Sequence, residues 1–394
     1  MRRVTIGALA FTLALGVATP AVLRSEDPRP GHVFITPAEV GLAVEGIEGA
    51  REAIRREIRR GGMPGATLAV GRGAALVLEE GFGRVGWSST TDRVDPDRTI
   101  YDLASLTKVV ATTAAAMLLY EDGKLDLDDA VSAHLPEFPH RRVTFRHLLT
   151  HTSGLPAGLR LRNVTPAQAR VRILRTPLQR DPGTEVEYSD LGFIVLWYAL
   201  EEMAGEPLPD LLTRRIYAPL GMRSTRFNPG RGCRSCAPTK LLKNGTVVRG
   251  VVHDPLAEAL AGRAGHAGLF STSHDPARFA AMLANGGELD GVRIFEEETI
   301  RLFTTPQPGA DSRALGWDTP SQDPEAIETS TVQSLSPHAF GHYGFTGTSL
   351  WVDPATGLWI VVLSNRVYAP RARNGIRELR RAVHDHLALA TESF

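Results

Sequence analysis

The chain is poor in cysteine, with only Cys233 and Cys236 among its 394 residues. A structural zinc site would need two further ligands, and neither a second cysteine pair nor a pair of histidines follows nearby. The spacing therefore argues against a metal at this pair. It leaves two alternatives, a small local disulfide, which an exported protein favours, or two free thiols.

Lysine is also scarce, since it accounts for only four of the 44 basic residues. The chain has no excess of either charge, because it contains 44 acidic residues as well. A chain without a basic excess lacks the electrostatic footprint of a nucleic-acid-binding protein, so we expect no nucleic-acid partner. With 43% hydrophobic residues, the chain is long enough for one large or two modest cores.

The apolar run near the N-terminus, Val4–Ala18, is short for a membrane span. Two arginines precede it and small residues follow it, a layout typical of a secretory signal. We therefore expect a signal peptide at residues 1–21, a charged and proline-rich tether at 22–36, and a periplasmic or extracellular protein. An uncleaved N-terminal anchor is the alternative, and only that would associate the chain with a membrane. No cysteine follows the run, which argues against a bacterial lipid anchor.

Two common catalytic patterns are missing from the sequence. No Gly-x-Ser-x-Gly elbow occurs, which argues against an ordinary α/β hydrolase. His147 and His151 stand four residues apart, but the glutamate of the HExxH metal-binding motif is absent. We therefore do not expect these two histidines to bind a metal.

One Ser-x-x-Lys pattern, Ser105 and Lys108, begins an apolar run that continues to Tyr120. If the run is helical, the two side chains lie one turn apart on the same face. A serine hydroxyl becomes a good nucleophile when a neighbouring base takes its proton, and a neutral lysine amine can be that base. Lysine has a reference pKa of about 10.4 that falls on burial, whereas arginine stays charged. A surface lysine one turn after a capping serine is the alternative reading.

Strand patterns occur near both ends of the chain. Two short apolar runs at 65–71 and 74–80 predict a β-hairpin, and runs at 349–353 and 357–364 predict another. Helical patterns broken by prolines lie between them, so we expect an α/β (α+β) fold with an antiparallel sheet flanked by helices. The expected division is a sheet domain from residues 37–123 and 264–394 with an inserted, mainly helical domain at 124–263.

Three short motifs resemble, in order and approximate separation, those of serine β-lactamases and penicillin-binding proteins. The motifs are Ser105-x-x-Lys108, Tyr188-x-Asp190 and His342-x-Gly344. The passages RHLLTHTSGLP, YSDLGF, GHAGLFS and GHYGFTGTS resemble most closely the class C-like branch. That branch includes D-alanyl-D-alanine carboxypeptidases, D-aminopeptidases, β-lactamase-fold esterases and penicillin-binding protein 4B types.

The resemblance implies a β-lactamase/transpeptidase-like fold and a mechanism through an acyl-enzyme. Ser105 would attack an amide, lactam or ester carbonyl, while Lys108 and Tyr188 would share the proton transfers. The backbone amides of Ser105 and Phe345 would form the oxyanion hole. The substrate would be a small molecule or a peptidoglycan peptide, and no cofactor or metal would be required. Nothing in the pattern indicates an oligomeric state.

Two residues depart from the usual motifs and bear on substrate choice. Asp190 stands where asparagine is usual, and an ionised carboxylate can only accept hydrogen bonds. His342 stands where many β-lactamases have the lysine that holds a substrate carboxylate. Because histidine is largely neutral above about pH 6.5, we expect His342 to hold a carboxylate only when protonated and we expect esters to be preferred to penicillins at neutral pH.

A non-catalytic cell-envelope protein with this fold, binding peptidoglycan or a partner, is the alternative function.

Overall fold

Strands from both ends of the chain form one five-stranded antiparallel sheet in the order β10-β11-β12-β1-β2. The structure is a computed structural model that describes residues 35–321, 332–368 and 375–392. The expected signal peptide and most of the tether lie outside these residues. The five strands are β1 (Gly65–Arg72), β2 (Ala75–Gly83), β10 (Phe340–Tyr343), β11 (Ser349–Asp353) and β12 (Leu358–Ser364).

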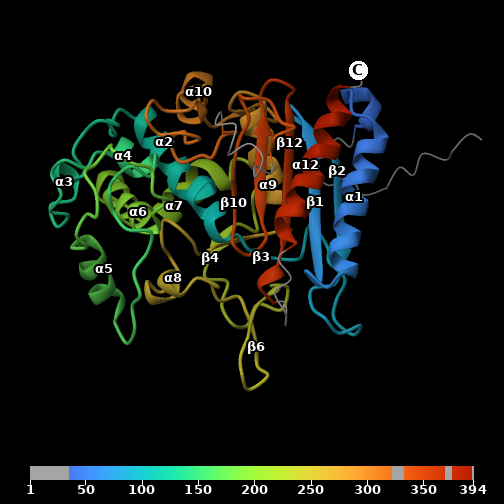
Figure 1. The fold of residues 1–394 in the computed structure, drawn as a ribbon, viewed down its shortest axis with the longest axis horizontal. Coiled ribbons are helices and arrows are strands. Elements are labelled where there is room, and N and C mark those ends of the chain that lie inside the picture. The colour runs from blue at the N-terminus through green and yellow to red at the C-terminus, as the bar shows by residue number, and fades with distance from the viewer. Residues whose placement is uncertain (1–34, 322–331, 369–374, 393–394) are drawn as a thin grey trace, which may run out of the picture. The chain divides into compact units, whose positions relative to one another are not determined.

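The sheet is covered by helices on both faces, so its central strands are apolar on both sides. Leu68 and Val70 of β1 pack with α1 (Val44–Arg59) and α12 (Ile376–Glu392), whereas Ala69 faces the core that contains α9 (His274–Ala284). This alternation follows the two-residue period of a strand. Each fully buried leucine or valine contributes about 1.5–3 kcal/mol of transfer free energy. Figure 1 shows α1 and α12 side by side along the sheet.

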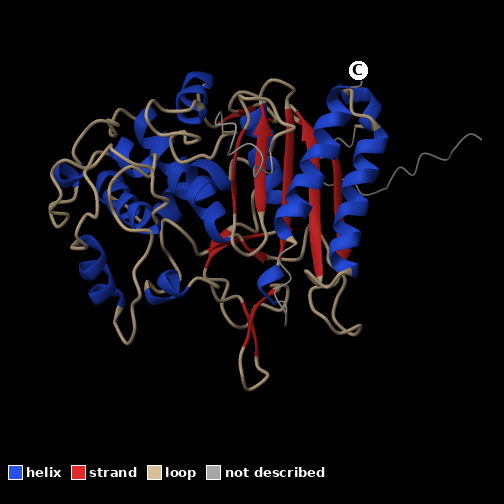
Figure 2. Ribbon diagram, viewed as in Figure 1, coloured by secondary structure: helices blue, strands red, loops and turns tan. Residues whose placement is uncertain are grey.

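Most of the remaining elements lie between β2 and β10, and most of them are short (Figure 2). Further helical segments between β2 and β10 are α3 (Val131–His134), α4 (Phe145–Leu149), α5 (Pro166–Leu174), α6 (Asp190–Ala204), α7 (Leu208–Leu212), η4 (Thr213–Tyr217), α8 (Pro255–Ala259) and α10 (Glu297–Thr304). The short strands are β3 (Tyr101–Asp102), β4 (Arg226–Phe227), β5 (Pro238–Leu241), β6 (Val247–Arg249), β7 (Leu269–Ser271), β8 (Glu288–Leu289) and β9 (Val292–Arg293). The two short 3-10 helices at the ends are η1 (Pro37–Val40) and η5 (Arg366–Tyr368).

The segment expected to lack strands contains a β-hairpin. β5 and β6 pair in the antiparallel direction and project away from the neighbouring elements (Figure 1). Asn244 and Gly245 lie in the connecting turn, and the Asn-Gly dipeptide is a strong local signal for a hairpin. That signal was available in the sequence. The division of the chain into a sheet domain and an inserted helical domain stays a prediction.

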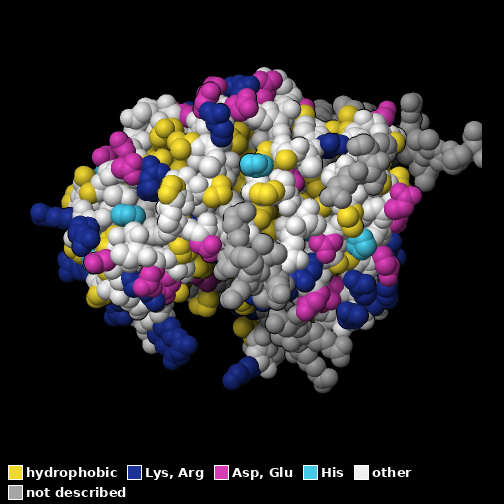
Figure 3. Space-filling model, turned by 45° about the horizontal axis from the view of Figure 1, so that its top comes forward, with side chains coloured by type: hydrophobic (Ala, Val, Ile, Leu, Met, Phe, Trp, Pro, Cys, Tyr) yellow, Lys and Arg dark blue, Asp and Glu magenta, His cyan; other side chains and the backbone are white. Residues whose placement is uncertain are grey.

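Acidic and basic side chains are interspersed on the face of the molecule drawn in Figure 3. This mixture accords with the equal numbers of acidic and basic residues in the sequence. Within the described residues, no helix is both long enough and apolar enough to cross a membrane.

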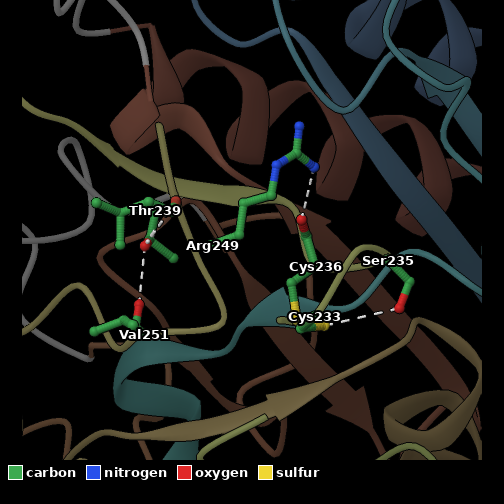
Figure 4. Close-up of a disulfide and its surroundings, with 7 residues drawn as sticks. Cys233, Ser235, Cys236, Thr239, Arg249 and Val251 are labelled. Atoms are coloured by element: carbon green, nitrogen blue, oxygen red, sulfur yellow. Dashed lines mark hydrogen bonds between the residues drawn. A yellow bond between two sulfur atoms is a disulfide. The ribbon is translucent and has the colours of Figure 1, made fainter. Parts of the chain in front are cut away.

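Cys233 and Cys236 are joined by a disulfide bond in the loop between β4 and β5 (Figure 4). Noncovalent contacts also hold this loop. The carbonyl of Cys236 accepts a hydrogen bond of 2.9 Å from Arg249, and the Ser235 carbonyl accepts one of 3.0 Å from the Ile100 amide. The loop is therefore tied to neighbouring segments independently of the covalent bond.

Reduction of this disulfide is expected to loosen the loop and leave the core folded. The bond closes a very small loop, so its removal should lower the free energy of unfolding by at most about 2 kcal/mol. Thermal unfolding with and without a reductant checks the size of the effect, and hydrogen exchange locates it. Two free thiols in a titration of the native, unreduced protein would contradict the pairing.

Candidate active site

The nucleophile turn is a sharp bend that follows β3. Ala104 has a φ of 48°, in the left-handed region that most residues avoid, and its amide donates a 2.9 Å hydrogen bond to the buried carboxylate of Asp102. Ser105 lies in the 3-10 turn η2 (Ala104–Leu106), which is followed by the π-helical segment η3 (Lys108–Thr113) and by α2 (Ala114–Glu121). The expected continuous helix is therefore wrong in detail, because the cap at Asp102 and the wide π turn reshape its first residues.

Ser105 and Lys108 meet, as their spacing predicts. Lys108 Nζ lies 3.3 Å from Ser105 Oγ, since residues three apart eclipse one another in a 3-10 turn. Ser105 is partly exposed, whereas Lys108 is fully buried. A substrate can therefore reach the hydroxyl while the amine stays shielded from water.

The environment of Lys108 alters its expected protonation state. Burial by itself would lower the pKa of Lys108, but the charges of Tyr188 and Asp190 and the hydrogen bond to Asp190 outweigh burial and raise this pKa. The Asp190 carboxylate lies 2.7 Å from Nζ. This direction favours an ammonium ion at Lys108 in the resting protein, and the expected share of Lys108 in the proton transfers stays a prediction.

Tyr188 lies against this ammonium ion, with Lys108 Nζ 4.6 Å from the centre of its ring. The tyrosine comes just before α6, whose N-terminal residue Ser189 caps the helix by accepting a hydrogen bond from Gly192. Capping residues adopt extended backbone before a helix begins. The cap therefore orients Tyr188 at the point where the chain enters α6.

His151 holds the tyrosine in this position, a role that the sequence alone does not indicate. Its Nδ1 accepts a 3.0 Å hydrogen bond from the Ser189 amide, and its ring centre lies 4.5 Å from that of Tyr188. Burial lowers the pKa of His151 well below the usual value, and the charges of Arg313 and Lys108 add to the effect. The imidazole is therefore neutral, as an acceptor must be.

His342 on β10 lies near Tyr188 but is not open to solvent. Its ring centre is 5.9 Å from that of Tyr188, its residue is only 2% exposed, and its Nδ1 donates to the Tyr343 carbonyl at 2.8 Å. Burial lowers the pKa of His342 well below the usual value, helped by the charges of Lys108 and Arg313. In the resting protein the imidazole is therefore neutral, and the expectation that a protonated His342 holds a carboxylate stays a prediction.

Arg313 places a cation beside Tyr188, where the neighbouring His342 is neutral. Its guanidinium lies 5.5 Å from the centre of the Tyr188 ring and forms an ion pair with Asp318. The backbone of Asp318 pairs with Gly341 at the start of the third motif. Arg313 is 29 residues before His342 in the chain, and no motif in the sequence pointed to it.

The turn after the third motif, between β10 and β11, lies directly beside the nucleophile turn. Thr346 and Thr348 donate hydrogen bonds of 2.7 and 2.9 Å to the carbonyls of Asp102 and Leu103. A Cβ at Gly344 would lie 2.5 Å from the Leu103 carbonyl and 1.9 Å from Thr348 Oγ1, so glycine permits this close approach. Phe345 follows with its side chain exposed. The oxyanion hole formed by the amides of Ser105 and Phe345 remains a prediction, and this geometry supports it.

One group of possible metal ligands lies behind Lys108. Atoms of Asp190, Asp254 and His266 lie within 4.8 Å of one another. Burial would raise the pKa of Asp254, but the 2.9 Å hydrogen bond from His266 helps to lower it to about 2. Lys108 already provides the positive charge beside Asp190, so the carboxylates do not need a metal ion for neutralisation.

Comparison with known proteins agrees with this geometry. A sequence model of the beta-lactamase family matches residues 50–385. A protein of Escherichia coli (strain K12) named "Putative D-alanyl-D-alanine carboxypeptidase" is 34% identical over 311 residues, which cover 70% of each chain. A protein of Salmonella typhimurium with the same name is 31% identical over 379 residues, 86% of each chain.

Solved structures show the same fold at lower sequence identity. EstCE1, described as a hydrolase with promiscuous acyltransferase activity, has a TM-score of 0.69 and 24% identity, covering 87% of this chain and 99% of its own. A penicillin-binding protein homologue from Caulobacter crescentus has a TM-score of 0.70 and 19% identity, covering 89% and 99%. The expected α/β, β-lactamase/transpeptidase-like fold is confirmed, and the chain belongs to the beta-lactamase family of serine hydrolases.

Proposed function

We propose that the protein is exported and hydrolyses amide, lactam or ester bonds through an acyl-enzyme on Ser105, as a D-alanyl-D-alanine carboxypeptidase or an esterase. The single observation that carries this proposal is the 3.3 Å contact between a partly exposed Ser105 Oγ and the buried ammonium of Lys108. The names of the relatives support the carboxypeptidase, and the activity named for EstCE1 supports the esterase.

In the proposed mechanism, Tyr188 acts as a phenolate and removes the proton of Ser105 as the hydroxyl oxygen forms a bond to the carbonyl carbon of the substrate. Lys108 remains charged and holds both Tyr188 and Asp190 in place. The amides of Ser105 and Phe345 stabilise the negative charge that develops on the carbonyl oxygen. Tyr188 returns the proton to the leaving group as the bond to that group breaks, and water then releases the acyl group from Ser105.

Intact-protein and peptide mass spectrometry tests the proposal directly. The protein is mixed in turn with a penicillin, a p-nitrophenyl ester and a D-Ala-D-Ala peptide, and the reaction is quenched with acid. We expect at least one of them to add an acyl group to the peptide that contains Ser105. No adduct with any of the three, or an adduct on another residue, would contradict the proposed function.

Replacement of Asp190 by asparagine is expected to shift the pH profile of kcat/KM. The Asp190 carboxylate raises the pKa of Lys108, so its removal lowers this pKa and the ammonium loses its proton at a lower pH. Because the proposed mechanism requires the charged form, the alkaline limb should move to lower pH in the variant. Asp210→Asn, at an exposed position of α7, is the matched control and should leave the profile in place. A shift of the acidic limb instead would show that the free amine is the active form.

A further inference from the structure

An exposed aromatic ring lies at the edge of the candidate active site. Phe345 is 63% exposed, although it directly follows Gly344, where the chain packs against the nucleophile turn. The guanidinium of Arg366 lies over the Phe345 ring at 4.9 Å from its centre, and the His253 ring stacks on it at 5.7 Å. A large exposed apolar side chain beside a catalytic serine suggests contact with substrate.

Arg366 is held by its backbone to the turn that contains Phe345. It begins η5, directly after β12, and its amide donates a 3.0 Å hydrogen bond to the Thr346 carbonyl. Thr346 in turn donates to the carbonyl of Asp102, two residues before Ala104. Two successive hydrogen bonds therefore connect Arg366 to the turn that carries Ser105.

Arg366 differs from the other desolvated arginines near the third motif because it lacks an acceptor in the described part of the chain. Arg313 pairs with Asp318, and Arg380 donates hydrogen bonds of 2.8 and 2.7 Å to the carbonyls of Gly344 and Thr348. Arg366 Nε is buried without a hydrogen-bond partner among these residues. Burial lowers the pKa of Arg366, and no acidic group in this part of the structure opposes that effect.

The buried Nε of Arg366 lacks an acceptor within the described residues, and an anion bound to the guanidinium would supply one. His253 cannot supply a second positive charge, because burial lowers its pKa. Of the two groups that lie against the Phe345 ring, the guanidinium is therefore the one that carries a charge. Its planar donors suit a carboxylate, with which arginine forms paired hydrogen bonds.

We propose that Arg366 and Phe345 form an anion subsite that takes a carboxylate of the substrate beside Ser105, and this inference rests on the proposed function. The Phe345 ring covers one side of the guanidinium and leaves its hydrogen-bond donors to the ligand. Arg366, rather than His342, then determines the preference between anionic and neutral substrates.

The test compares neutral and anionic esters that otherwise match. Phenyl acetate is paired with 4-carboxyphenyl acetate, which carries the carboxylate on the leaving group, and phenyl benzoate with phenyl 4-carboxybenzoate, which carries it on the acyl group. The measured quantity is the ratio of kcat/KM for the anionic ester to that for its neutral partner. The two esters of a pair also differ in intrinsic reactivity. That difference is the same for every variant, so it cancels when the ratio is compared between variants.

We expect Arg366→Gln to lower the ratio by about 10- to 100-fold for one of the two pairs, the size of one lost charged hydrogen bond. Arg366→Lys should restore part of it because the charge remains, and Phe345→Leu should lower it less than Arg366→Gln does. Arg172→Gln, which removes the same charge from an exposed position of α5, is the matched control and should leave the ratio unchanged. Should Arg366→Gln fail to fold, Phe345→Leu and Arg366→Lys still test the subsite.

The two possible failures can be told apart. If no ester acylates Ser105, the proposed function is wrong and the subsite falls with it. If esters do acylate Ser105 but both ratios are unchanged in Arg366→Gln, the subsite is wrong and the proposed function stands. A fall in the ratio in Arg313→Gln but not in Arg366→Gln would assign the anion to Arg313 and overturn the inference.

Discussion

Ser105→Ala is expected to abolish turnover of every substrate that the parent protein hydrolyses, with a loss of kcat of at least about 10⁴-fold. The alanine variant has no covalent nucleophile, so only binding and the oxyanion hole would remain. A 10⁴-fold loss corresponds to about 5.4 kcal/mol of transition-state stabilisation. Steady-state kinetics with the best ester or peptide substrate measure the loss, and mass spectrometry should find no acyl adduct.

The fold should survive this substitution. Ser105 is partly exposed and its side chain has only the 3.3 Å contact with Lys108 among the described residues, so the free energy of unfolding should change by less than about 1 kcal/mol. Ser88→Ala, at an exposed serine in a loop, is the matched control and should keep full activity. Labelling of the parent protein by a β-lactam or a fluorophosphonate at a residue other than Ser105 would refute the assignment.

Lys108→Arg is expected to be nearly as damaging as Lys108→Ala, with losses of about 10²- to 10⁴-fold for both. Lys108 is fully buried, and its ammonium lies within 3.5 Å of Ser105, Asp190 and the carbonyl of His266. A guanidinium keeps the charge, but it is larger and planar, so it overpacks the buried site. Its donors also point in fixed directions and cannot replace the compact ammonium among these three oxygens. Kinetics of both variants, with thermal unfolding to confirm the fold, provide the measurement.

The matched control is Lys124→Arg, an exposed lysine after α2, which should behave as the parent protein does. Activity above a tenth of the parent in Lys108→Arg would show that a positive charge of any shape is sufficient at this position. Activity would then require only a positive charge at position 108, and the hydrogen-bond geometry of Nζ would not affect proton transfer from Ser105.

Local sequence was sufficient to predict the central pair and the central sheet. The contact between Ser105 and Lys108 needs only a helical turn, because residues three apart share a face in a 3-10 or an α turn. The strands β1, β2, β11 and β12 were predicted because short apolar runs separated by turn residues are typical of β-hairpins. The Asn-Gly turn between β5 and β6 is an equally local signal, and it predicts the hairpin that the expected helical segment contains.

Protonation states could not be predicted in the same way. Burial of Lys108 was a sound reason to expect a lowered pKa, but the carboxylate that raises it belongs to Asp190, 82 residues further along the chain. His342 is buried because of its position on β10 beside Tyr188. The short motif His342-x-Gly344 does not indicate that the histidine is buried. The sequence identified these two groups without indicating their charges.

The sequence by itself determined the nucleophile, the family resemblance and the strands that close the sheet from both chain ends. Only the tertiary structure decided which cations and acceptors surround that nucleophile. It brought Arg313 to Tyr188 and His151 to the Ser189 amide, and it set Arg366 over Phe345. The physical reason is that chain connectivity specifies neighbours three or four residues apart, whereas charge and desolvation act through space between segments that meet only when the chain is folded.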